Sequence, residues 1–258
     1  MQYDIDEILK AAIQIAKKGG NHTLQYFNQN VEVEFKSDDS PVTQADREGE
    51  TLMREAIQEE FPDHGILGEE YGRMNGKSEI QWILDPIDGT LSFIHGVPLY
   101  TTLVGVLIAD EPVVGIIYAP ALDELCDAAK NRGARLNGTT CSVSGCKELS
   151  KATLLTTDIN SVREYDLDKP FEALLSETRI HRTWGDAYGH MLVATGRADI
   201  MFDPILNIWD AAPLLTILQE AGGSFTDVDG NPTIKTGNGF SCNKNLFKPI
   251  KKIFEQSK

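Results

Sequence analysis

Trp82-Ile83-Leu84-Asp85-Pro86-Ile87-Asp88-Gly89-Thr90 is the stretch that decides the fold of this chain. Its apolar start, residues 82–84, predicts the end of a buried strand. The strand leads to two carboxylates at a turn that Pro86 stiffens, because proline fixes its own φ. Gly89 allows close approach of the backbone to a ligand, and Thr90 adds a hydroxyl. This pattern suits a divalent cation that carries a phosphate, although an acidic turn with a helix cap would look the same.

Two distant segments decide between these interpretations. They are Ile66-Leu67-Gly68-Glu69-Glu70 upstream and Ile208-Trp209-Asp210-Ala211-Ala212-Pro213 downstream. With the central stretch they resemble the inositol monophosphatase family of Mg²⁺-dependent phosphatases, whose pattern is Gly-Glu-Glu, Asp-Pro-Ile-Asp-Gly-Thr and Trp-Asp-x-Ala. The resemblance extends from Thr43 to about Asp227 and includes three motifs in the right order, which three unrelated acidic turns would not produce.

Composition limits the class of protein. The chain has 258 residues, of which 41% are hydrophobic and 24% charged, as in ordinary soluble globular proteins. Its net charge of −15 disfavours binding to nucleic acid or to an anionic membrane. The longest apolar runs, such as 103–109, are too short to span a bilayer. Because the N-terminus carries no secretory signal pattern, we expect a cytoplasmic protein.

Periodicity and turn residues outline the elements. In the first half they predict a helix from Ile5 that ends at Gly19-Gly20, a strand at 31–35, a polar loop at 36–41, a helix at 43–61, a strand at 65–68 and a flexible loop at 72–77. After the central stretch they predict an antiparallel meander of strands at 99–109, 113–118 and 124–128, and then a strand at 153–157, helices at 169–176 and 188–195, a strand at 199–202 and a helix at 210–221.

We interpret the chain as two tightly joined subdomains with a boundary near Cys146. Residues 1–146 form an α+β metal-binding subdomain, and residues 147–258 form an α/β subdomain that completes the active site. The resemblance implies an α/β (α+β) fold, a layered α-β-α-β-α sandwich of the inositol monophosphatase and fructose-1,6-bisphosphatase type.

Four carboxylates, Glu69, Asp85, Asp88 and Asp210, come from three separate segments. In one pocket they would repel one another unless cations neutralised them, and all-oxygen ligands favour Mg²⁺ or Mn²⁺ over zinc. The resemblance implies two or three Mg²⁺ per site. It assigns Glu69, Asp85 and the carbonyl of Ile87 to one ion, and Asp85, Asp88 and Asp210 to the second, so that Asp85 bridges them.

A two-metal site activates a water on one side and stabilises the leaving oxygen on the other. The N–H groups of Gly89 and Thr90 would bind phosphate oxygens, and the Thr90 hydroxyl, paired with Glu69, would orient the attacking water. The carboxylate of Asp46 either caps a helix or, as the resemblance suggests, holds Thr90 or the water of a further metal. We therefore expect direct hydrolysis of a phosphomonoester.

Two rival functions are weaker. In an aspartyl-phosphate enzyme Asp85 would be the nucleophile, but the haloacid dehalogenase type spaces its aspartates as Asp-x-Asp, and here they stand three positions apart. A regulatory protein without catalysis, as some relatives are, would have no need to keep every ligand position.

Departures from the family pattern point to one branch. The motif after Asp88 reads Gly89-Thr90-Leu91-Ser92-Phe93 where the family usually has Gly-Thr-x-Asn-Phe. Trp184-Gly185-Asp186-Ala187-Tyr188 replaces a Gly-Ser/Thr-Ala segment, and Asp203 replaces a glutamate. These features resemble the histidinol-phosphate phosphatase branch.

The substrate prediction follows from charge. We expect the substrate to contact residues Asp88, Gly89, Thr90, Asp186, Ala187, Asp203 and Asp210. Asp186 and Asp203 would pair with the ammonium or imidazole of histidinol phosphate, whereas inositol 1-phosphate, the main alternative, has a neutral polyol. Fructose 1,6-bisphosphate and 3′-phosphoadenosine nucleotides carry extra phosphates, which would need more cationic side chains in the pocket than Arg182 and Arg197, the only ones nearby in this stretch. The resemblance also implies a homodimer.

Overall fold

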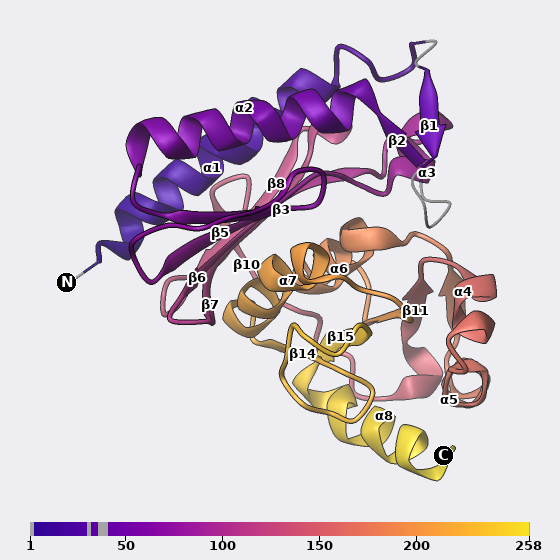
Figure 1. The fold of residues 1–258 in the computed structure, drawn as a ribbon. Helices are drawn as coiled ribbons and strands as arrows, with labels where there is room; N and C mark the ends of the chain where they lie inside the picture. Colours follow the sequence, from indigo (N-terminus) through magenta and orange to yellow (C-terminus); the bar gives the residue numbers. More distant parts are fainter. Residues whose placement is uncertain (1–2, 30–31, 36–40, 258) are drawn as a thin grey trace.

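A computed structural model describes residues 3–29, 32–35 and 41–257 of the chain. The polar loop predicted at 36–41 lies, except for Pro41, outside these described residues, as does the start of the strand predicted at 31–35. The structure is built from two sheets and the helices that cover them (Figure 1).

The larger sheet has eight strands and contains the central stretch. In spatial order the strands are β10 (Thr139–Cys141), β9 (Gly133–Leu136), β8 (Glu124–Ala129), β7 (Glu111–Ala119), β6 (Thr101–Ile108), β5 (Ile80–Asp88), β3 (Gly65–Gly68) and β4 (Gly72–Met74). Neighbouring strands are antiparallel except β3 and β5, which are parallel. The predicted meander over β6, β7 and β8 is therefore correct.

The smaller sheet has five strands from the second half of the chain. In spatial order they are β12 (Ile180–Arg182), β11 (Thr153–Thr156), β13 (Ile200–Asp203), β15 (Gly239–Asn243) and β14 (Gly223–Thr226). A separate pair, β1 (Val33–Phe35) and β2 (Pro41–Thr43), lies before the second helix. The chain passes from the larger sheet to the smaller one between residues 142 and 152, the stretch that contains the boundary predicted near Cys146. The division into subdomains stays a prediction.

Helices cover both faces of each sheet, which gives the predicted α-β-α-β-α order (Figure 1). The outer layer on the larger sheet consists of α1 (Ile5–Thr23) and α2 (Gln44–Glu60). The middle layer, between the two sheets, consists of α6 (Asp186–Ala194) and α7 (Ile208–Glu220). The outer layer on the smaller sheet consists of α4 (Ile159–Glu164), α5 (Asp168–Glu177) and α8 (Lys244–Gln256). A short helix, α3 (Thr90–Ile94), follows β5. No helix within the described residues has the length and apolar character needed to cross a membrane.

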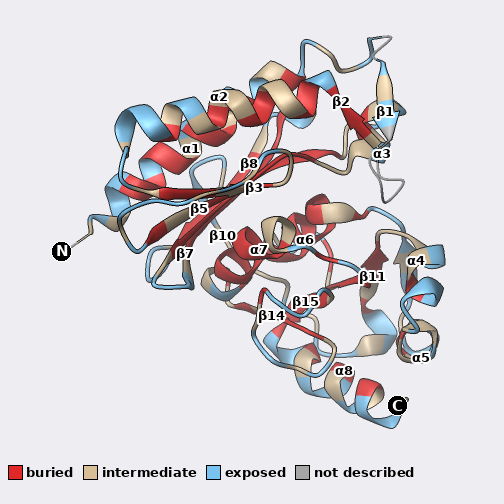
Figure 2. Cartoon of the chain, in the orientation of Figure 1, coloured by how far each residue is buried: buried red, intermediate tan, exposed pale blue. Residues whose placement is uncertain are grey.

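Side chains of β5 point alternately to the two helix layers that cover the larger sheet. Trp82 and Leu84 pack with α1 and α2, while Ile83, between them, packs with α6 and α7. Successive side chains of a strand point to opposite faces, so a sheet covered on both faces has an unbroken apolar run. Figure 2 shows the buried residues concentrated between the layers.

Two paired glycines let α7 lie close to the larger sheet. Gly105 and Gly115 stand opposite each other on β6 and β7. A Cβ at Gly115 would lie 2.3 Å from the carbonyl oxygen of Pro213, and one at Gly105 would lie 2.8 Å from the Cβ of Ala212. Because the obstructing atoms belong to the helix itself, a larger residue would push α7 away from the sheet.

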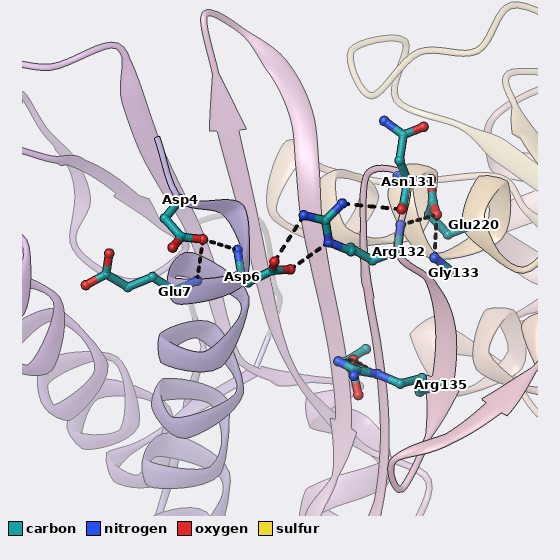
Figure 3. A network of polar contacts seen from close by, with 9 residues as sticks. Asp4, Asp6, Glu7, Asn131, Arg132, Gly133, Arg135 and Glu220 are labelled. Carbon is teal, nitrogen blue, oxygen red and sulfur yellow. Dashed lines mark hydrogen bonds and ion pairs between the residues drawn. The ribbon is translucent and has the colours of Figure 1, made fainter. Parts of the chain in front are cut away.

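The far end of α7 is fixed by a polar network (Figure 3). The carboxylate of Glu220 accepts hydrogen bonds from the backbone N–H groups of Asn131, Arg132 and Gly133, in the turn between β8 and β9. The guanidinium of Arg132 in turn pairs with Asp6 at the start of α1. This turn therefore connects the middle helix layer to an outer one.

Several predicted boundaries are wrong. The first helix does not end at Gly19-Gly20 but continues to Thr23, because both glycines are packing contacts: Gly19 lies against Met53 and Gly20 against Tyr118. The loop predicted at 72–77 begins with strand β4, which pairs with β3. The helix predicted at 188–195 begins earlier, at Asp186. The sequence analysis also missed α4, β12, β15 and α8.

Candidate active site

The carboxyl end of β5 supplies the first two carboxylates of the site. Residues three apart in a regular strand point to opposite faces, so Asp85 and Asp88 would normally diverge. The pairing of β5 with β6 shifts its register between these two residues, and the carbonyl of Pro86 accepts a hydrogen bond from the Thr102 hydroxyl at 2.8 Å. Such an irregularity re-aims side chains, and here both aspartates line one cavity.

Gly89 follows with φ +81°, a conformation that favours glycine, and α3 begins at Thr90. A Cβ at Gly89 would lie 2.8 Å from an Oδ2 atom of Asp186, so glycine is required for space as well. The Thr90 hydroxyl donates to the carbonyl of Ile87 at 3.1 Å. A hydroxyl has one hydrogen, so the predicted pairing of Thr90 with Glu69 as acceptor requires it to rotate away from Ile87.

Glu69 reaches the site through the parallel pairing of β3 with β5. Gly68 stands opposite Leu84, and the N–H of Glu69 donates to the carbonyl of Leu84 at 3.2 Å. The next residue on each strand is therefore a carboxylate, Glu69 beside Asp85. Glu69 lines the cavity. Glu70 continues into the turn before β4.

Asp210 comes from the first turn of α7, far away in the sequence. One of its oxygens accepts the N–H of Asn207 at 2.6 Å and so caps the helix. Asp85, Asp88 and Asp210 each place one carboxylate oxygen within 4.8 Å of the others. The structure thus brings together three of the four predicted metal-binding carboxylates in one group, with Glu69 in the same cavity.

These carboxylates, of which Asp85 is buried and Asp88 and Asp210 are half-buried, repel one another. Burial, followed by the charges of Glu69, Asp88 and Asp210, raises the pKa of Asp85 well above its usual value. Burial also raises the pKa of Asp88, and it raises that of Asp210 to about 7. No ion pair among the described residues includes Asp85, Asp88 or Asp210. Carboxylate oxygens whose charge no described side chain balances fit a hard divalent cation.

The start of α6 closes another side of the cavity. The N–H of Ala187 donates to Asp88 Oδ2 at 2.8 Å, and the Thr101 hydroxyl donates to the same oxygen at 2.9 Å. Asp186, with φ 53°, stands beside Gly89. The predicted pairing of Asp186 with the cationic part of the substrate would therefore take place next to the phosphate-binding loop predicted at Gly89.

Asp203, at the end of β13, is buried and also lines the cavity. Its Oδ2 accepts the hydroxyl of Thr157 at 3.0 Å, and Thr157 Oγ1 accepts the N–H of Asp186 at 2.8 Å. One threonine therefore links the carboxylate of Asp203 to the backbone of Asp186. Burial raises the pKa of Asp186 to about 6 and raises the pKa of Asp203 well above its usual range, since desolvation disfavours the charged form.

Asp46 caps a helix, which is one of the two roles that the sequence allowed for it. Its carboxylate accepts both the N–H and the hydroxyl of Thr43, at 2.8 and 2.6 Å, in a capping box at the start of α2. Burial raises its pKa to about 7, and Glu70 and Glu69 contribute to the rise. Asp46 thus caps the helix within electrostatic range of the site, and its role toward Thr90 or a metal-bound water stays a prediction.

The cavity has a volume of about 250 Å³ and a strongly acidic wall. Six carboxylates line it: Glu69, Asp85, Asp88, Asp186, Asp203 and Asp210. None of the described residues in the lining is Lys, Arg or His. Arg182 is exposed and bonds to the carbonyl of His181, and Arg197 pairs with Glu124, so neither faces this cavity.

The sequence analysis missed the residues that hold these carboxylates in place. The hydroxyl of Thr101 donates a hydrogen bond to Asp88, and the hydroxyl of Thr157 donates one to Asp203. Asn207, three residues before Asp210, completes a capping pattern that could have been found in the sequence. The two threonines give no comparable local signal, because their partners lie far away in the chain.

Comparison with known proteins identifies the family of this chain. The profile of the inositol monophosphatase family matches residues 4–257. A histidinol-phosphatase of Chlorobaculum parvum is 43% identical over 236 residues, which cover 90% of each chain. The structure resembles the inositol monophosphatase of Anabaena (Nostoc), with a TM-score of 0.87, 31% identity and coverage of 99% of this chain and 98% of that one.

The extragenic suppressor protein suhB of Bartonella henselae has the same fold, with a TM-score of 0.90 at 27% identity, over 98% of this chain and 100% of the other. These matches confirm the resemblance that rests on the three acidic motifs, and they confirm the layered fold that it implies. The family profile covers nearly the whole chain. This chain therefore belongs to the inositol monophosphatase family, a family of phosphatases.

Proposed function

We propose that this protein is a Mg²⁺-dependent phosphomonoesterase that hydrolyses histidinol phosphate to histidinol and phosphate, as a step of histidine biosynthesis. One observation carries the proposal: the metal-binding group of carboxylates shares its cavity with two further carboxylates, Asp186 and Asp203, and with no described lysine, arginine or histidine. Since Asp186 lies beside Gly89, such a wall selects a substrate that is anionic at its phosphate and carries a cation close to it, as the ammonium group of histidinol phosphate is.

The residues fit two Mg²⁺ ions, and Mn²⁺ could replace them. The prediction also allows a third ion. Glu69, Asp85 and the carbonyl of Ile87 would hold one ion, and Asp85, Asp88 and Asp210 the second. When bound, the metals would polarise the phosphate, activate a water for attack and stabilise the leaving oxygen. Hydrogen bonds donated by Asn207, Thr101 and Ala187 hold the carboxylates of Asp210 and Asp88 in place, where they would bind the second ion.

Other residues act on phosphate and water. The N–H groups of Gly89 and Thr90 lie where the chain enters α3 and would bind phosphate oxygens. The Thr90 hydroxyl would turn from Ile87 toward Glu69 and align the attacking water. Asp46, which caps α2 nearby, would support this arrangement through its charge. Asp85 needs no covalent role, so hydrolysis is direct.

The choice of substrate rests on electrostatics. A carboxylate about 4 Å from a cation gains about 4 kcal/mol at an intermediate dielectric, before desolvation costs. Asp203 is buried and accepts a hydrogen bond from the neutral Thr157 hydroxyl, so leaving its charge without a cation beside a neutral polyol is costly. Both effects favour histidinol phosphate over inositol 1-phosphate. The Chlorobaculum relative, named a histidinol-phosphatase, supports the same choice.

Two alternatives compete with this function. The Anabaena inositol monophosphatase shares the fold at 31% identity, which favours inositol 1-phosphate as the second candidate substrate. A regulatory protein that keeps the fold without catalysis is the other alternative, but such a protein would gain nothing from a complete set of metal-binding carboxylates.

A phosphate-release panel tests the proposal. Purified protein at fixed Mg²⁺ is assayed with histidinol phosphate, inositol 1-phosphate, fructose 1,6-bisphosphate and a 3′-phosphonucleotide. We expect the highest kcat/KM for histidinol phosphate, by at least about tenfold over inositol 1-phosphate, since 1.4 kcal/mol of the gross pairing energy is enough for that ratio. A higher kcat/KM for inositol 1-phosphate would replace the proposal with the second candidate.

The same panel with variants shows whether charge is the reason. Asp186→Asn and Asp203→Asn should each lower kcat/KM for histidinol phosphate much more than for a neutral phosphomonoester. Asp127→Asn is the matched control, since Asp127 is a buried aspartate that pairs with Arg135 on the larger sheet, outside this cavity. Equal losses on both substrates would leave a general phosphomonoesterase.

We also propose a cytoplasmic homodimer that binds neither nucleic acid nor membrane. The net charge of −15 supports the absence of polyanionic partners. The dimer rests on the family resemblance alone. Light scattering on the purified protein should give a mass twice that of the chain, and a monomer mass would reject the dimer.

A further inference from the structure

A carboxylate that the function above does not use lies directly behind the metal-binding loop. Glu50, on α2, is fully buried. Its Oε2 accepts the N–H of Glu70 at 2.7 Å, and its Oε1 accepts the N–H of Tyr71 at 3.1 Å. Both donors belong to the turn that joins β3 to β4. Burying a carboxylate costs free energy unless its oxygens are paired, and these hydrogen bonds to the turn supply such partners for Glu50.

Arg54, one helical turn further along α2, holds Glu50 in this position. Its Nε donates to Glu50 Oε1 at 2.6 Å, and its Nη2 donates to the carbonyl of Gly72 at the start of β4. The guanidinium also lies 6.0 Å from the ring centroid of Tyr71. Since the guanidinium is planar and its donors are fixed in a fork, it sets the carboxylate and the turn in one geometry.

The turn held in this way carries Glu69. The N–H of Glu69 bonds to the carbonyl of Leu84, next to Asp85, and the two following N–H groups bond to Glu50. Three consecutive backbone donors are therefore fixed by groups outside the turn. Gly68 completes the arrangement, because a Cβ there would lie 2.1 Å from Glu50 Oε1.

The same face of α2 also backs the other metal-binding segment. A Cβ on Gly49 would lie 3.1 Å from the Cβ of Pro86, between Asp85 and Asp88. Asp46, one turn earlier, caps the helix beside the site. Residues three and four apart on a helix share a face, so α2 presents adjacent supports to both segments.

We propose that Glu50, fixed by Arg54, is a positioning residue that presents the carboxylate of Glu69 to the metal site. The proposal rests on the metal-binding part of the proposed function, and it goes beyond it by naming a residue that touches neither metal nor substrate. Groups that orient a metal ligand through hydrogen bonds typically change metal affinity by 10–100-fold when they are replaced.

The test compares Glu50→Gln with Glu55→Gln, the same chemical change at an exposed position on the same helix. Mn²⁺ binding is measured by electron paramagnetic resonance of the free ion, and amide exchange of residues 70 and 71 by NMR on the metal-free protein. In Glu50→Gln we expect one Mn²⁺ site to weaken about 10–100-fold and both amides to exchange at least about tenfold faster. In Glu55→Gln neither should change.

Kinetics separate positioning from a general structural effect. At saturating Mn²⁺, kcat and the substrate KM of Glu50→Gln should return to within about threefold of the unmodified protein, because only metal affinity is altered. Should Glu50→Gln fail to fold, Arg54→Lys keeps the charge but loses the bridging fork, and it should shift Mn²⁺ affinity and amide exchange in the same direction by less.

Three outcomes would count against the proposal. A lower unfolding temperature with unchanged Mn²⁺ affinity and unchanged exchange at residues 70 and 71 would make Glu50 a structural residue only. Faster exchange with unchanged Mn²⁺ affinity would show that the turn does not position Glu69. If the unmodified protein bound no Mn²⁺, the metal centre of the proposed function would fail first, and this role would fail with it.

Discussion

Replacing Asp85 with Asn is expected to lower phosphatase activity at least about a thousandfold while the protein stays folded. Asp85 is the proposed bridge between two metals, and metal ions supply several kcal/mol of transition-state stabilisation, where each 1.36 kcal/mol is tenfold in rate. Asn keeps the shape but removes a charge that the neighbouring carboxylates repel. The metal-free variant should therefore unfold at the same temperature as the unmodified protein or at a higher one.

Steady-state phosphate release and thermal unfolding with and without chelator check this expectation. Excess EDTA should abolish the activity of the unmodified protein, and added Mg²⁺ should restore it. Asp127→Asn serves again as control and should keep kcat/KM within about twofold, since Asp127 lies outside the cavity. Substantial activity in excess EDTA, or in Asp85→Asn, would contradict the two-metal proposal.

Thr90→Val should lower kcat by about a hundredfold or more and leave KM nearly unchanged. Valine keeps the shape of threonine and removes the hydroxyl that is proposed to align the attacking water. Alignment is worth most in the transition state, so its loss appears in kcat. In the structure this hydroxyl bonds only to the Ile87 carbonyl among the described residues, so the fold loses one hydrogen bond, about 1 kcal/mol.

Thr90→Ser is the matched variant, because it keeps the hydroxyl and loses a methyl group. We expect its kcat to stay within about tenfold of the unmodified protein. If Thr90→Val instead raised KM with kcat unchanged, Thr90 would be a substrate-binding residue. If valine and serine variants lost equal activity, the methyl group and not the hydroxyl would matter.

Local patterns in the sequence were enough to predict the strand that leads to the site and the meander after it, whereas the layered order was predicted from the family resemblance. The run 82–84 is apolar on both faces because helices cover both sides of β5, and that pattern is visible without the structure. The helical periodicity likewise located the start of α1 at Ile5, where Asp4 caps the helix. Family resemblance then supplied what patterns cannot, namely which distant acidic segments meet.

The remaining features depend on contacts between residues far apart in the chain. Gly19 and Gly20 were expected to end a helix, but tertiary packing against Met53 and Tyr118 uses them inside it. The register shift that turns Asp85 and Asp88 to one side depends on the pairing of β5 with β6. The side-chain support from Glu50 gave no signal either, since a glutamate on a predicted helix is ordinarily exposed.

The position of α7 between the two sheets also has a consequence for how the protein acquires its metal centre. Asp210 meets Asp85 only when this helix is packed against the glycine pair on β6 and β7, with the smaller sheet on its other side. Contacts between segments so distant in sequence form late, because closing the intervening chain costs entropy first. A partly folded chain therefore offers a cation only scattered carboxylates, and the proposed Mg²⁺ would stabilise the finished fold without guiding its early steps.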